Sequence, residues 1–190
     1  PEAASASGDS AASTSTRFTG PTLIPPERGA AGCSAPPAVR GWDNPGAMNP
    51  EVIRRLPKTD LHVHLDGSLR LGTLIDLART RGVALPSETP EGLEALVFRP
   101  RYMNLNEYLE GFRYTVAVLQ DEEALERSAL ELAEDCQEEG VRYLEVRFAP
   151  QLHVRPGFDV SAVVRAVDRG LRRAADAFNR RPQVRDGGEP

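Results

Sequence analysis

The segment from Leu56 to Leu69, LPKTDLHVHLDGSL, constrains the fold more than any other part of the chain. Its polar and apolar residues alternate as in a β-strand, where successive side chains point to opposite faces. The two faces of such a strand would carry Asp60, His62, His64 and Asp66 on one side, and Leu61, Val63 and Leu65 packed on a core on the other.

The two histidines of this segment are candidate metal ligands. Residues in a strand advance about 3.3 Å each, so the imidazoles of His62 and His64 stand roughly 6–7 Å apart at their backbones and can lean toward one ion. Neutral imidazole suits zinc, and the chain places two of its three histidines here. The alternative is an exposed amphipathic strand whose polar face is only solvated.

The rest of the chain is predicted to form helices around a second strand. Gly82 and Gly140 are expected to end two of the helices, and Pro150 to end the second strand. On that strand, Glu145 and Arg147 share a face and are expected to form an internal ion pair. The expected elements are a short helix through Arg55, a helix from Leu71, a short helix from Pro90, a helix from Asn104 or Asn106 to Leu119 with an apolar stripe facing the core, a helix from Asp121, a strand over 141–149, and a helix begun by Asp159 or Ser161.

The order strand, helices, strand, helix is typical of an α/β fold with parallel pairing. The thirteen residues from Leu56 to Ser68 resemble the first-strand signature of the adenosine deaminase family, within the metal-dependent amidohydrolase superfamily. The segments 140–150 and 112–120 resemble that family's second strand and the helix before it, and the similarity covers about Asn49 to Asn179. The resemblance implies the N-terminal portion of a (β/α)8 TIM-type barrel, which takes about 250 residues when complete.

The resemblance also implies a reaction and its site. The complete protein would use one Zn2+ ion per active site to convert adenosine or deoxyadenosine into inosine or deoxyinosine and ammonia. His62 and His64 would bind the metal, and His64 and Asp66 would contact the substrate, with Asp66 hydrogen-bonded to the ribose. The other ligands and the general acid would lie beyond residue 190, so we expect this chain to be an inactive fragment. His153 matches no family ligand and is expected to be a loop histidine.

Composition divides the chain into three parts. Residues 1–48 are rich in Ala, Ser, Gly, Pro and Thr, and they lack the large apolar side chains that offset the entropy of ordering. We expect a disordered low-complexity leader over 1–48, the first part of an adenosine deaminase-like barrel domain over 49–179, and a flexible truncated end over 180–190. Met48 would be a natural translation start, since the chain begins with proline.

The net charge and the cysteine content indicate which binding partners and which cellular compartment to expect. The net charge is −5, which leaves no broad basic surface for nucleic acid. Cys33 and Cys136 form no disulfide framework, which suits the cytoplasm, and no apolar run is long enough to cross a membrane. The expected ligand is a small purine nucleoside.

Two alternatives remain at this point. Adenine and aminofutalosine deaminases of the same superfamily tend to carry Glu where this chain has Asp66, which favours a nucleoside. A non-catalytic remnant or interaction module could also keep the motif. Cytidine-deaminase signatures and phosphate-binding glycine motifs are absent from the sequence.

Overall fold

The structure is a computed structural model that describes residues 12–17 and 49–185. The described chain forms these elements in order: β1 (Ala12–Arg17), α1 (Pro50–Arg55), β2 (Lys58–His64), the 3-10 turn η1 (Leu65–Gly67), α2 (Leu71–Arg81), α3 (Pro90–Leu96), α4 (Leu105–Leu109), α5 (Phe112–Val118), α6 (Glu122–Glu138), β3 (Val141–Phe148), the 3-10 turn η2 (Pro150–His153), α7 (Val160–Asn179) and α8 (Pro182–Arg185).

The sheet has the strand order β1-β3-β2. β2 and β3 are parallel, with Asp60 opposite Leu144 and His64 opposite Arg147, which confirms the predicted parallel pair. The connection between them contains α2 to α6, and this length allows the chain to return to the same end of the sheet.

Strand β1 was not predicted, because it lies inside the expected disordered leader. Residues 12–17 pair antiparallel with β3, from Ala12 opposite Phe148 to Arg17 opposite Tyr143. Pairing of this kind needs backbone groups and β-compatible residues such as Thr rather than large apolar side chains, and β3 offers an open edge to pair with. The expectation of disorder is therefore wrong for these six residues, and the rest of 1–48 lies outside the described residues.

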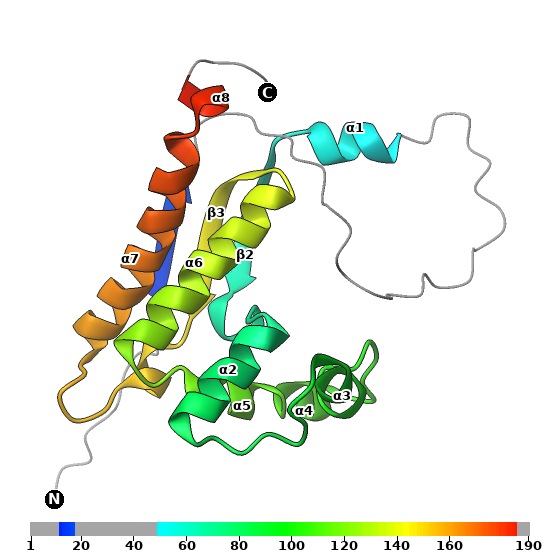
Figure 1. Ribbon diagram of the computed structural model, residues 1–190, viewed down its shortest axis with the longest axis vertical. Coiled ribbons are helices and arrows are strands. Elements are labelled where there is room, and N and C mark those ends of the chain that lie inside the picture. The colour runs from blue at the N-terminus through cyan, green and yellow to red at the C-terminus, as the bar shows by residue number, and fades with distance from the viewer. Residues whose placement is uncertain (1–11, 18–48, 186–190) are drawn as a thin grey trace, which may run out of the picture.

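Helices α6 and α7 lie side by side and cover one face of the sheet (Figure 1). Leu144 and Val146 of β3 are fully buried, as are Leu125 of α6 and Leu171 of α7. The two helices approach closely at Gly170, where an added Cβ would lie 2.2 Å from the backbone oxygen of Glu126. This contact explains why a larger residue cannot occupy position 170.

The helix boundaries follow the predicted capping residues. The side chains of Asp121 and Asp159 accept hydrogen bonds from the backbone N–H groups of Ala124 and Ala162, at 2.9 and 2.7 Å. Asn104 and Asp159, rather than Asn106 and Ser161, are the caps of their helices. Gly82 ends α2 with a φ of 66°, in the left-handed region that glycine adopts readily.

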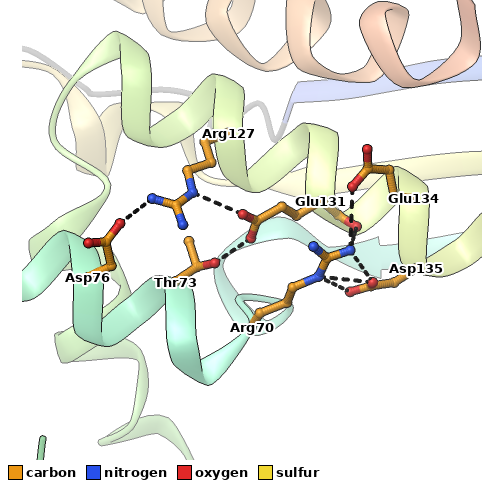
Figure 2. A network of polar contacts seen from close by, with 7 residues as sticks. All are labelled: Arg70, Thr73, Asp76, Arg127, Glu131, Glu134 and Asp135. Atoms are coloured by element: carbon orange, nitrogen blue, oxygen red, sulfur yellow. Dashed lines mark hydrogen bonds and ion pairs between the residues drawn. The ribbon is translucent and has the colours of Figure 1, made fainter. Parts of the chain in front are cut away.

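A polar network joins the start of α2 to α6 (Figure 2). Arg70, directly before α2, donates from Nε to both carboxylate oxygens of Asp135 at 3.0 and 3.1 Å. The Thr73 hydroxyl, which is buried, donates to Glu131 at 2.6 Å, and Arg127 donates to the same carboxylate at 2.9 Å. These contacts hold the chain leaving β2 and η1 against α6.

The predicted single helix ending at Leu119 is instead two helices, α4 and α5, separated at 110–111. Its apolar stripe was expected in the core, but Leu105, Tyr108 and Leu109 are 67%, 45% and 47% exposed. The core receives Val118 and Leu119 from this region instead. With only five residues, α4 is too short to present a stripe to the sheet, and it lies with α2, α3 and α5 beyond the end of β2 (Figure 1).

The C-terminal part also differs from the expected flexible end. Residues 182–185 form α8, which contacts α7, while 186–190 lie outside the described residues. None of the helices in the described ranges is both long enough and apolar enough to span a membrane.

Candidate metal and substrate site

His62 and His64 of β2 turn their imidazole rings toward each other. Their Nε2 atoms are 3.1 Å apart, and the ring centroids are 5.0 Å apart with an interplanar angle of 43°. Both residues are exposed, so the two nitrogens are accessible. Side chains that start two residues apart on the strand thus converge on one point.

The spacing of these nitrogens suits one metal ion. A tetrahedral zinc ion with Zn–N distances of about 2.0–2.1 Å separates two ligand nitrogens by about 3.3 Å. The two histidines therefore fit two corners of a zinc tetrahedron. Among the residues that the structure describes, no group of three or more His, Cys, Asp or Glu side chains is arranged to hold a metal.

Asp60 does not join the histidines, contrary to the prediction. Asp60 is opposite Leu144 and Val63 is opposite Val146, so Leu61 and His62 together face a single residue of β3. This irregularity is a β-bulge, which breaks the alternation of side chains and is common next to functional sites. The bulge places Asp60 on the sheet face that carries Leu144.

The thiol of Cys136 is consistent with this placement of Asp60. Burial raises the pKa of Cys136 on α6 to about 12, and the Asp60 carboxylate contributes to the increase. Asp60 is therefore close enough to Cys136 to interact with it electrostatically, while its Oδ1 accepts a hydrogen bond from the His62 backbone N–H at 3.3 Å. A thiol with so high a pKa stays protonated at neutral pH and is a poor metal ligand.

The apolar face of β2 is only partly buried, which also differs from the prediction. Leu65 is fully buried and Val63 is partly buried, but Leu61 is 56% exposed. Leu61 lies within the bulge, and β2 is an edge strand of the described sheet. No neighbouring strand covers Leu61 in this part of the protein.

Asp66 lies in η1, directly beyond the end of β2, and is 7% exposed. Its Oδ1 atom is 3.7 Å from Nδ1 of His64, a separation too long for a direct hydrogen bond. Oδ1 has no hydrogen-bond partner among the described residues. A buried carboxylate oxygen of this kind is available to a ligand or a water molecule.

The turn that carries Asp66 is held in place by local contacts. The Ser68 hydroxyl donates to the His64 backbone oxygen at 2.6 Å, and the Ser68 N–H donates to Leu65 at 3.1 Å. A Cβ at Gly67 would be 3.4 Å from the Phe112 ring of α5. Gly67 thus lets the turn pack tightly against α5.

His153, which was expected to be a loop histidine, ends η2 and is fully buried. Its Nδ1 atom is 2.8 Å from the backbone oxygen of Leu119. A signal was present in the sequence, because His153 closely follows a parallel strand, and the carboxyl ends of such strands are where ligands bind in α/β sheets.

Glu145 and Arg147 form the predicted ion pair on β3. Nη2 of Arg147 is 3.0 Å from Oε2 of Glu145. The Tyr143 hydroxyl donates to the other carboxylate oxygen at 2.9 Å. The pair is therefore part of a network along one face of the strand.

Comparison with known proteins gives consistent results. The sequence model of the family described as adenosine deaminase matches residues 57–184. The chain is 47% identical over 126 residues to an adenosine deaminase of Shewanella halifaxensis, and 46% identical over 135 residues to adenosine deaminase 1 of Streptomyces coelicolor. These matches cover 66% and 68% of this chain but only 38% and 34% of the relatives, so the chain spans little more than a third of their length.

Solved structures show the same similarity. The crystal structure of arabidopsis ADAL complexed with GMP matches with a TM-score of 0.51 and 29% identity, over 66% of this chain and 37% of that one. The crystal structure of arabidopsis ADAL complexed with IMP matches with a TM-score of 0.50 and 31% identity, over 64% of this chain and 35% of that one.

Proposed function

The chain belongs to the adenosine deaminase family, and we propose that its residues form the first part of a zinc-dependent active site that deaminates adenosine and deoxyadenosine. The products would be inosine or deoxyinosine and ammonia. The observation that carries the proposal is the 3.1 Å separation between Nε2 of His62 and Nε2 of His64.

In this site His62 and His64 would hold the metal. Zinc, when bound, supplies a nucleophilic hydroxide at neutral pH, because it lowers the pKa of a bound water to about 7. Nδ1 of His64 then faces Asp66 Oδ1 at 3.7 Å, and a carboxylate at this place helps to orient a ligating imidazole. Nδ1 of His64 is thus directed toward the carboxylate of Asp66.

Asp66 has a second role in the proposal, as the acceptor of a hydrogen bond from the ribose. Its position after the last residue of β2 supports this role, since barrel enzymes bind substrates at the carboxyl ends of their strands. Because the carboxylate is nearly buried, water competes weakly for it. His64 is then close to the same substrate group.

The ADAL structures carry GMP and IMP, so a purine nucleotide is a second candidate ligand. A 5′-phosphate next to the Asp66 carboxylate would place two negative charges together in a poorly solvated turn, which is unfavourable. Asp66 therefore favours a nucleoside over a nucleotide.

The site needs groups that the described residues lack. A catalytic zinc normally has three protein ligands and one open position, whereas the described residues supply two histidines. We infer that the complete enzyme contains further strands of a (β/α)8 barrel that provide the other ligands and the general acid. The parallel pair β2 and β3, with helices on one face, supports this assignment for residues 49–179. Chain 1–190 alone would then be inactive.

The proposed compartment is the cytoplasm.

The test uses the complete enzyme that contains this chain. Metal is removed by chelation, zinc is restored, and the deamination of adenosine, deoxyadenosine, adenine, aminofutalosine and AMP is followed by ammonia release. We expect zinc-dependent turnover with adenosine and deoxyadenosine preferred by at least tenfold. A preference for AMP would support the nucleotide, and zinc binding without turnover of any purine would support a non-catalytic module.

A further inference from the structure

His153 has a defined tautomer. The Leu119 carbonyl can only accept a hydrogen bond, so Nδ1 of His153, 2.8 Å away, is the donor. Burial lowers the pKa of His153, which keeps the ring neutral. A neutral ring that carries its proton on Nδ1 leaves Nε2 as a bare acceptor.

Two buried acceptors in this region have no partner. Nε2 of His153 and Oδ1 of Asp66 both lack a hydrogen bond to any described residue, although the residues are 0% and 7% exposed. The Asp66 carboxylate also raises the pKa of His153, against the larger effect of burial, so the two groups interact electrostatically. Buried polar atoms are nearly always satisfied, so each of these two acceptors requires a donor.

The surrounding contacts hold both groups at one end of the sheet. Asp66 follows β2 and His153 follows β3. Because these strands are parallel, both residues lie beyond the carboxyl end of the same sheet. Gln120 donates to the Leu152 backbone oxygen at 3.0 Å, beside the bond between His153 and Leu119. The end of α5 thus fixes η2, while the Phe112 ring of α5 packs on η1.

We infer that His153 is a positioning residue for Asp66. A single water molecule bridges them, donating one hydrogen bond to His153 Nε2 and its other hydrogen bond to Asp66 Oδ1. Two acceptors cannot bond each other, whereas water can donate to both. The bridge fixes the carboxylate so that it meets the ribose of the substrate. This inference rests on the proposed function only for the ribose contact; the coupling between the two residues does not.

Two substitutions separate the two nitrogens of His153. In His153→Asn the amide nitrogen takes the place of Nδ1, so the bond to Leu119 is kept and the acceptor at Nε2 is lost. In His153→Gln the longer side chain reaches the place of Nε2, so the acceptor is kept. The two substitutions are therefore matched controls, since each keeps the function of one ring nitrogen of His153 and removes that of the other.

The first measurement is a double-mutant cycle on urea unfolding of the complete enzyme, with His153→Asn and Asp66→Leu alone and together. If one water joins the two residues, His153→Asn should change the unfolding equilibrium constant at least fivefold less in the Asp66→Leu background than in the parent. Effects that combine additively within twofold would overturn the inference, because independent sites add within about this limit.

The second measurement is the kinetics of the complete enzyme with adenosine. We expect His153→Asn to raise KM about tenfold with kcat within twofold, His153→Gln to recover most of the loss, and the effect to vanish in an Asp66→Leu background. Equal losses with His153→Asn and His153→Gln, unchanged by Asp66→Leu, would indicate a merely structural histidine and overturn the inference. A parent enzyme inactive on adenosine would contradict the proposed function, and the unfolding cycle would still decide the coupling.

Discussion

Nε2 of His62 and Nε2 of His64 lie 3.1 Å apart, although the residues are separated by Val63 on the strand. The register shift between Asp60 and Val63 takes Asp60 off the face that carries the two imidazoles, and its Oδ1 accepts a hydrogen bond from the His62 backbone N–H at 3.3 Å instead. The carboxylate of Asp66 lies on the Nδ1 side of His64. The arrangement separates a metal-binding side of His64 from a carboxylate-facing side.

Replacement of Asp66 by alanine should impair substrate binding more than metal binding. The loss of a charge-assisted hydrogen bond amounts to about 1.5–3 kcal/mol, so kcat/KM for adenosine should fall roughly 10- to 100-fold. Zinc content, measured by mass spectrometry on the purified complete enzyme, should stay stoichiometric. Unchanged efficiency together with lost zinc would show that Asp66 serves the metal alone.

Asp121 should contribute to stability in two ways. Its carboxylate caps α6 and accepts hydrogen bonds from Arg81 at 2.6 and 2.8 Å. We expect Asp121→Ala to lower the free energy of unfolding by about 1–2 kcal/mol at pH 7, as for other lost caps. Asp168→Ala removes an exposed pair with Arg172 and should change it by less than about 0.5 kcal/mol.

The contribution of Asp121 should depend on pH. The hydrogen bond from Arg81 lowers the pKa of Asp121 below its unfolded value of about 3.9. The stabilisation is therefore present above that value and is lost as the pH falls through the folded-state pKa. Urea unfolding at pH 7 and pH 3 should show a smaller effect of Asp121→Ala at pH 3. An equal effect at both would contradict the ionic contribution.

Cys136 should be unreactive in the folded chain. With a pKa of about 12, about one thiol in ten thousand is ionised at pH 8, against about a quarter for an ordinary cysteine. In a Cys33→Ser variant, a disulfide reagent should label Cys136 only after urea is added. Labelling in buffer as fast as in urea would show that α6 does not pack on the sheet as described.

Chain 1–190 should not deaminate adenosine by itself. The described residues bring together two metal-capable histidines rather than three ligands, and a catalytic zinc needs about three. The experiment adds zinc to the purified chain and follows adenosine absorbance beside the complete enzyme. Turnover within an order of magnitude of the complete enzyme would show that a third ligand and an acid lie within these residues.

The sequence predicted the regular parts of the fold because their signals are local. Asp121 begins the helix that it was expected to begin, Asp159 is one of the two caps expected for α7, and Gly82 ends α2. The ion pair of Glu145 and Arg147 followed from their shared face on a strand. Caps and strand faces depend on residues close in sequence, so they can be read without the tertiary structure.

The remaining features depend on contacts between distant segments. The bulge that redirects Asp60 arises from the register of β2 against β3, which alternation alone does not reveal. Burial of His153 depends on α5 reaching η2 through Leu119. Strand β1 depends on an open edge of β3 rather than on apolar residues of its own. None of these three features can be predicted from local sequence, because each depends on how distant segments pack in the folded chain.

The most direct test of the account is the zinc content of His62→Ala and His64→Ala in the complete enzyme. Each variant, purified at neutral pH and dialysed against metal-free buffer, is compared with the parent and with Asp168→Ala as a surface control. The account predicts about one zinc per chain in the parent and in the control. It predicts less than about a tenth in each histidine variant, since each removes one of the few ligands. Stoichiometric zinc in both histidine variants would contradict the assignment of the converging imidazoles as metal ligands.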